Sequence, residues 1–183
     1  MKKVTMLSAV IASMFSVSAL ASNYSYNDET FKLDIGKSTV KVSQCDKAKK
    51  CDDATADVKA LKATLEKRIG EYQKLLDDRK GVLKKVKKQV DAAESVIKDE
   101  KGKATYVMVN LGENFNLPIP EKDAKEGKFD IVFSAIEANV SRFKRVLDML
   151  ESGKAPKGFK AKDYGEIAPI MEMHNVVKFA KHL

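Results

Sequence analysis

The fold is decided by the stretch LKATLEKRIGEYQKLLDDRKGVLKKVKKQVDAAESVI, residues 61–97. It contains no proline, and residues of high helix propensity dominate it. Its apolar residues recur at steps of three and four, which is the period of an amphipathic helix. They are Leu65, Ile69, Tyr72, Leu76, Leu83, Val86, Val90, Ala93 and Ile97, interrupted by Arg79. The sequence therefore predicts a long helix over about residues 54–101.

We expect this helix to be continuous. At about 1.5 Å per residue it would be ~70 Å long, more than one small core can cover. The alternative is a helical hairpin that folds back near Gly81, but a single glycine inside a helix costs only about 1 kcal/mol. The apolar seam is also wider than a two-stranded coiled coil needs. We therefore expect the stripe of Leu76, Leu83, Val86 and Val90 to project and meet a partner.

The positive charge of this helix is concentrated in its second half. The segment Arg79-Lys80-Gly81-Val82-Leu83-Lys84-Lys85-Val86-Lys87-Lys88 is followed by its first acid at Asp91. The spacing of its lysines places four of them on one helix face. The candidate partner-binding residues are Lys80, Leu83, Lys84, Lys87, Lys88 and Val90. They would contact a protein partner, another copy of the chain, an anionic lipid or a cell-wall polymer; the alternative is a lysine face that only keeps a long helix hydrated.

A small antiparallel sheet is predicted at the base of the long helix. Apolar and polar residues alternate on both sides of Gly36-Lys37-Ser38, which is typical of a β-hairpin over residues 30–43. A hairpin alone is marginal in water, so we expect a third strand at 104–110. Residues 110–120 contain Pro118 and Pro120 and are predicted to cross the surface as an extended loop.

Two shorter helices complete the prediction. Asp123 and Glu126 have capping-box spacing, so the first helix should begin between Ala124 and Phe129. It should end at Gly153, and a basic loop follows over 154–162. The last helix is expected from Glu166 or Ala168 to Lys181, with Pro169 near its start. The fold class is therefore α+β and helix-dominated, with one small antiparallel sheet, one long helix and two shorter packing helices.

The first 21 residues predict export. Lys2 and Lys3 precede an apolar run from Val4 to Val17, and Ala19-Leu20-Ala21 matches the small-x-small pattern of a signal peptidase site. We expect a cleaved signal peptide over 1–21 and a single mature domain over 22–183 that works in the periplasm or is secreted beyond it. The apolar run is shorter than the ~20 residues of a membrane span. Cleavage removes two lysines and no acid, so the formal charge falls from +8 to +6. A basic periplasmic protein meets anionic surfaces rather than nucleic acid.

The two cysteines, Cys45 and Cys51, are predicted to form a disulfide in an oxidising compartment. Six residues apart in one helix, they would be separated by about 9 Å along the axis, which is beyond disulfide reach. The bond must therefore close a turn. A redox pair, a metal pair or an intermolecular bridge are the alternatives, but the spacing is not the Cys-x-x-Cys of redox sites and most zinc sites.

The two histidines, His174 and His182, offer little for a metal site. Eight residues apart on a helix, they are separated by about 12 Å and cannot bind one ion together. Met171-Glu172-Met173-His174 contains soft ligands that copper(I) or haem iron use, but methionine is also ordinary core material. The motifs of serine hydrolases, zinc proteases, P-loop enzymes and dinucleotide enzymes are absent from the sequence. We assign no catalytic, cofactor-binding or metal residue.

These observations favour a non-enzymatic periplasmic binding or scaffold protein that uses a long basic amphipathic helix. One alternative is an inhibitor or regulator of an envelope or cell-wall enzyme, which would bind its target tightly and one to one. Another is a haem- or copper-binding helical protein, which would be coloured or carry metal.

Export is tested by the intact mass of the protein recovered from the periplasm. The chain should begin at Ser22 and be lighter by two protons because of the disulfide. Full-length protein in the cytoplasm with free thiols would contradict the expectation.

Overall fold

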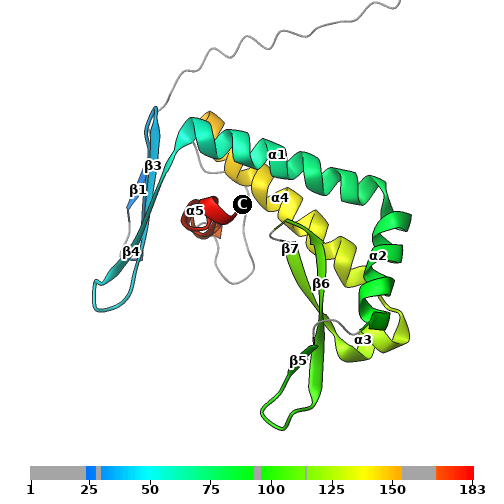
Figure 1. Ribbon diagram of the computed structural model, residues 1–183. Coiled ribbons are helices and arrows are strands. Elements are labelled where there is room, and N and C mark those ends of the chain that lie inside the picture. Colours follow the sequence, from blue (N-terminus) through cyan, green and yellow to red (C-terminus); the bar gives the residue numbers. More distant parts are fainter. Residues whose placement is uncertain (1–23, 28–29, 93–95, 114, 154–167) are drawn as a thin grey trace, which may run out of the picture.

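The computed structural model describes residues 24–27, 30–92, 96–113, 115–153 and 168–183 (Figure 1). The predicted signal peptide and the predicted basic loop over 154–162 lie outside these residues. The fold is α+β with more residues in helices than in strands, as predicted. The strands are β1 (Tyr24–Asn27), β2 (Phe31–Ile35), β3 (Thr39–Cys45), β4 (Cys51–Asp57), β5 (Val96–Lys98), β6 (Ala104–Gly112) and β7 (Phe115–Pro120). The helices are α1 (Val58–Asp77), α2 (Arg79–Ala92), α3 (Glu121–Glu126), α4 (Asp130–Ser152) and α5 (Ala168–Lys178), followed by a 3-10 turn, Ala180–His182.

The strands form two antiparallel sheets rather than the one that the sequence predicted. Sheet A has the order β1-β2-β3-β4, and sheet B has the order β5-β6-β7. The hairpin over 30–43 is confirmed as β2 and β3, but the predicted third strand at 104–110 is β6 of sheet B and does not pair with it. Short alternating segments predict strands well but do not say which strands pair, because pairing is set by tertiary contacts.

Helices α1 and α4 join the two sheets. They lie side by side, and α4 runs back from sheet B toward sheet A (Figure 1). Their centre is aromatic: the ring of Tyr72 on α1 lies 4.7 Å from that of Phe115 on β7 and 5.8 Å from that of Phe143 on α4. Sheet A turns Phe31, Leu33 and Val42 toward α5, and all three are buried. One continuous core therefore runs through both ends of the molecule.

The disulfide between Cys45 and Cys51 is confirmed and closes the β3–β4 turn. It also marks a correction, because residues 51–57 are a strand and not the start of a helix. The helix begins at Val58, where the carboxylate of Asp57 accepts a hydrogen bond of 2.7 Å from the backbone N–H of Ala60. Of the three aspartates expected to cap the helix, only Asp57 does so, whereas Asp52 and Asp53 lie within the strand.

The predicted continuous helix over 54–101 is wrong, because the chain turns at Asp78 (Figure 1). The N–H of Asp78 donates to the carbonyl of Lys74 and closes α1, while its carboxylate accepts a bond of 3.0 Å from the N–H of Gly81 and opens α2. A Cβ on Gly81 would lie 2.1 Å from that carboxylate, so glycine makes room for the cap. The hairpin alternative is wrong as well, since α2 packs on β6 instead of returning along α1.

Other boundaries differ for local reasons. Residues 96–98, predicted as helix, form β5, and the predicted loop over 110–120 contains β7. A separate helix, α3, occupies 121–126, so Asp123 and Glu126 lie inside it and do not cap α4. Gly153, with φ 61°, ends α4 as predicted, and α5 begins at Ala168. No helix in the described part of the chain is long and apolar enough to cross a membrane.

The corner at Asp78 predicts a coupled mutational effect. Asp78→Ala should lower the free energy of unfolding by about 1 kcal/mol through loss of the cap. Gly81→Ala should not stabilise the wild type, because its methyl group displaces the capping carboxylate. In the Asp78→Ala background the same change should stabilise by about 1 kcal/mol, the ordinary preference of a helix for alanine. Denaturant unfolding of the four proteins measures the coupling, and additive effects would contradict the role given to Gly81.

Candidate binding surface on α2

One face of α2 is held against sheet B. Val82 and Val86 are buried there, and the side chain of Gln89 bonds the backbone of Asn110 twice. Its amide nitrogen donates to the Asn110 carbonyl at 2.9 Å, and its carbonyl oxygen accepts from the Asn110 N–H at 2.7 Å. Because these contacts fix the rotation of α2 about its axis, the opposite face must point into solvent.

The outward face of α2 is lined with lysines. They are Lys80, Lys84, Lys85, Lys87 and Lys88, and all are exposed. None of the five forms an ion pair with another described residue. Arg79 is different: its guanidinium lies 2.7 Å from a carboxylate oxygen of Glu137 and 4.6 Å above the ring of Phe133. Arg79 thus anchors α2 to α4, whereas the lysines have no counter-charge of this kind within the described part of the chain.

A groove of about 610 Å³ runs beside these lysines. Lys84, Lys87 and the exposed Leu83 form one wall, and the α3–α4 junction forms the other. Its lining residues are Leu83, Lys84, Lys87, Gly127, Lys128, Phe129, Asp130 and Phe133. Gly127, with φ 68°, ends α3 in a left-handed turn that directs Phe129 back toward the core. The groove therefore combines apolar side chains with a rim in which three lysines, Lys84, Lys87 and Lys128, outnumber the one acid, Asp130.

The predicted binding residues do not all lie on this surface. Lys80, Leu83, Lys84, Lys87 and Lys88 are exposed, but Val90 is half-buried and packs against the core. The predicted projecting stripe is also wrong. Its members Leu76 and Val90 are partly buried and Val86 is fully buried, while Leu83 keeps 37% of its surface exposed. Phe129, Phe133 and Lys128 were missed because they come from a segment distant in sequence.

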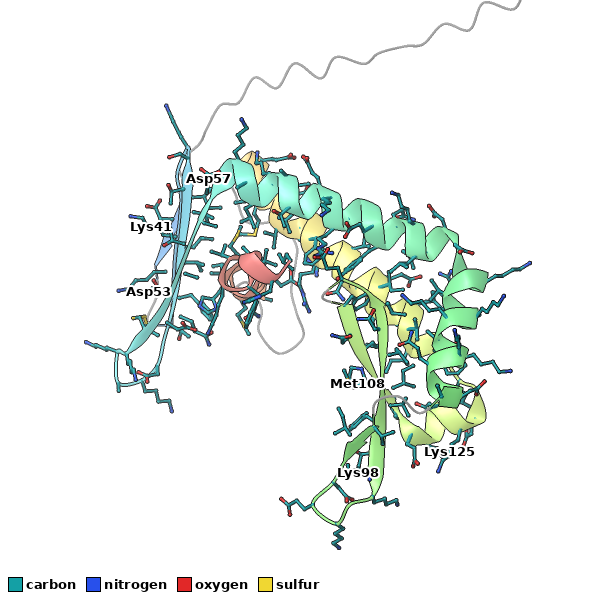
Figure 2. All side chains as sticks on the ribbon, viewed as in Figure 1. Lys41, Asp53, Asp57, Lys98, Met108 and Lys125 are labelled. Carbon is teal, nitrogen blue, oxygen red and sulfur yellow. A yellow bond between two sulfur atoms is a disulfide. The ribbon has the colours of Figure 1, made fainter. Side chains whose placement is uncertain are left out.

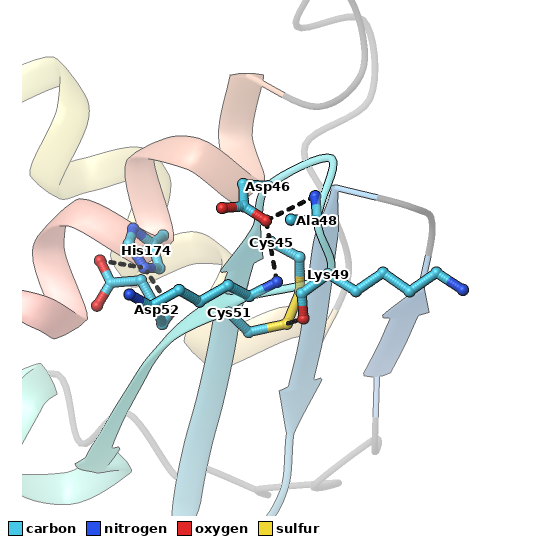
Figure 3. The surroundings of a disulfide bond; sticks show 8 residues. Cys45, Asp46, Ala48, Lys49, Cys51, Asp52 and His174 are labelled. Atoms are coloured by element: carbon cyan, nitrogen blue, oxygen red, sulfur yellow. Dashed lines mark hydrogen bonds and ion pairs between the residues drawn. A yellow bond between two sulfur atoms is a disulfide. The ribbon is translucent and has the colours of Figure 1, made fainter.

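The second candidate cluster surrounds His174 (Figure 3). Its Nε2 lies 3.1 Å from the backbone carbonyl of Asp52 and 3.7 Å from the carboxylate of that residue. Lys178, one turn further along α5, pairs with the same carboxylate. The hydrogen bond from Lys178 holds the pKa of Asp52 below its ordinary value. The Nδ1 of His174 is buried without a hydrogen-bond partner in the described structure.

This histidine cluster offers little room for chemistry. His174 is 2% exposed, and the neighbouring Met173 is fully buried in the core. His182 is exposed on the 3-10 turn, so the two histidines are not brought to one site. Among the described residues, no group of three or more His, Cys, Asp and Glu side chains could hold a metal ion. The cluster therefore serves to attach α5 to the start of β4.

Glu172 is also committed to packing. Its carboxylate accepts two hydrogen bonds from Arg145 of α4, of 2.8 Å from Nε and 2.5 Å from Nη2. This pairing raises the pKa of Arg145. Bidentate pairing of this kind fixes the orientation of both side chains, so Glu172 joins α5 to α4.

Comparison with protein-family models, with curated proteins and with solved structures finds no match for this chain.

Two substitutions on α2 distinguish its faces. Val86→Ser should lower the free energy of unfolding by roughly 2–4 kcal/mol, because it leaves a cavity and buries a hydroxyl. Leu83→Ser should cost less than about 1 kcal/mol, because this side chain is exposed. Thermal or denaturant unfolding measures both. Equal destabilisation would mean that the rotation of α2 is different from that described.

Proposed function

We propose that this protein is a non-enzymatic binding protein of the bacterial periplasm that holds an acidic protein segment against α2. The observation that carries the proposal is a set of five exposed lysines beside an apolar groove, none of them in an ion pair with a residue that the structure describes. Desolvating one such lysine is unfavourable, but an acidic partner supplies the missing counter-charge. A surface of this kind also accelerates association with acidic partners by electrostatic steering.

The groove favours a protein segment over a bare polyanion. A cell-wall polymer could neutralise the lysines but has no large apolar side chain to place between Leu83 and Phe129. An acidic segment with an apolar side chain can use both features at once, since interfaces gain most from a buried anchor surrounded by a polar rim. A partner enzyme of the envelope would fit this description, so the regulator alternative is one form of the same proposal.

Two features support the proposed compartment. The disulfide joining Cys45 and Cys51 is of the kind that persists in an oxidising environment, and the first 21 residues have the pattern of an export signal. The haem or copper alternative has weaker support, because His174 is buried and its Nε2 is engaged by Asp52.

The proposal is tested with a fluorescent acidic peptide of glutamate and leucine, helical and with one leucine face. Fluorescence anisotropy should show binding that weakens as salt rises. Changing Lys80, Lys84, Lys87 and Lys88 together to glutamate should weaken it at least about tenfold, since each exposed pair contributes a few tenths of a kcal/mol or more. Leu83→Ser should weaken it separately through loss of the apolar anchor.

The matched control reverses Lys32 and Lys41 on sheet A and Lys47 and Lys50 in its β3–β4 turn, all of them exposed, and gives the same change in net charge. This variant should keep most of the affinity. If both quadruple variants lost the same affinity, binding would depend on overall charge alone, and the proposed surface on α2 would be wrong. Binding to phosphatidylglycerol vesicles, with none to the peptide, would replace the protein partner by a lipid surface.

A further inference from the structure

The edges of the two sheets differ in how far they are protected. Exposed edges can pair with any extended chain, so proteins shorten them or place proline, lysine or bulges in them. β1 has four residues. β5 has three and a register shift between Ile97 and Lys98, and β7 carries Pro118 and Pro120. β4 has seven residues, pairs with β3 in unbroken register, and contains no proline or lysine.

The backbone of β4 offers hydrogen-bonding groups on its outer side. Two backbone hydrogen bonds flank the paired residues of β3 and β4. At the Asp57 end of β4, the N–H of Val58 donates to the carbonyl of Ser38, and at the Cys51 end, the N–H of Asp46 donates to the carbonyl of Lys50. Because bonded pairs alternate along an antiparallel ladder, Asp52, Ala54 and Ala56 use their backbone groups toward β3. The N–H and C=O groups of Asp53 and Thr55 therefore point away from β3, and no described strand pairs with them.

A hollow of about 560 Å³ adjoins this edge. On the face toward the helices, β4 presents Asp52, Ala54 and Ala56, and the small side chains of the two alanines leave space beneath α1 and α5. The remaining lining comes from Asp52, Asp53, Thr55, Asp57, Ala60, Leu61, Thr64, Val177, Lys178 and Ala180. A strand added beside β4 would place every second side chain over this hollow.

The negative charge of β4 determines which kind of added strand it can bind. Its charged residues are Asp52, Asp53 and Asp57, in a protein of net charge +8. Asp52 is paired with Lys178 on the helix side, whereas Asp53 lies on the outer face with Lys41 as its basic neighbour (Figure 2). Asp57 follows on the same face of the strand, and one oxygen of its carboxylate accepts the capping bond from Ala60. Pairing of two β4 strands would bring like charges together, which is unfavourable. A basic strand would instead place its lysines or arginines beside Asp53 and Asp57.

We propose that β4 is a docking edge for an extended basic segment of another protein, which adds a fifth strand to sheet A. Its backbone bonds Asp53 and Thr55, its apolar side chains enter the hollow over Ala54 and Ala56, and its basic side chains lie on the outer face. This surface is separate from the lysines of α2, so one molecule can hold an acidic partner at one end and a basic strand at the other.

The test uses a labelled peptide of alternating lysine and valine, seven residues long, with anisotropy as the readout. It should bind the intact protein. A second peptide of equal charge, N-methylated at alternate residues on the side facing β4, should bind at least about tenfold more weakly, because it can no longer donate hydrogen bonds to the carbonyls of Asp53 and Thr55. An alternating glutamate and valine peptide should not bind.

Variants of β4 place the site. Thr55→Pro removes an outward N–H without touching the ladder to β3 and should abolish binding, whereas Thr55→Val keeps the N–H and should not. Asp53→Lys should weaken binding of the lysine and valine peptide by charge repulsion. Because this variant leaves the backbone of β4 unchanged, the test remains decisive if the proline variant is unstable. Reversal of the four α2 lysines should leave this affinity unchanged or raise it slightly. Equal binding of the N-methylated peptide, or a dimer of the free protein abolished by Thr55→Pro in sedimentation, would overturn the proposal.

Discussion

The hydrogen bond from the N–H of Gly81 to the carboxylate of Asp78 determines the course of the chain. A helix that continued past Asp77 would carry its apolar residues away from the core, and Val82 and Val86 would have nothing to pack against. The corner instead lays α2 on β6, where both valines are buried. The lysines are exposed for the same reason, because a helix with one face fixed by packing must present the other to water.

The need to bury apolar faces also explains why two helices, α1 and α4, lie between the sheets. Neither a four-stranded nor a three-stranded sheet of this size can cover its own apolar face, so each needs a helix against it. Arg68 shows how closely α1 is fitted to sheet B. It is 5% exposed, pairs with Glu71 at 2.7 Å, and donates to the carbonyl of Glu113 at 3.3 Å. A buried guanidinium is tolerable here because its hydrogen bonds are satisfied at the turn that joins β6 to β7.

Local signals in the sequence predicted the elements whose stability is local. The alternation of β2 and β3, the apolar stripe of α4 and the glycine at its end belong to this class, as does the disulfide between close cysteines. β4 was misread because aspartates suggest a helix start, and its strand conformation depends on pairing with β3. β7 was misread because proline disfavours strands, although an edge strand tolerates it. On the candidate surface, spacing correctly placed the lysines on one face. The phenylalanines of the groove could not be found, since only the tertiary fold brings α4 beside α2.

The position of α5 has a consequence for how the chain can be made. Sheet A is complete within the first third of the sequence, yet the helix that covers its apolar face begins at Ala168 and contacts β2, β3 and β4. During synthesis from the N-terminus, Phe31, Leu33 and Val42 therefore remain uncovered by α5 until nearly the whole chain has emerged. The strands of sheet A can pair early, but their apolar face is buried by α5 only near the end of synthesis. While residues 58–167 are being synthesised, the nascent chain carries an exposed apolar sheet face. Any factor that shields such faces can act throughout this period.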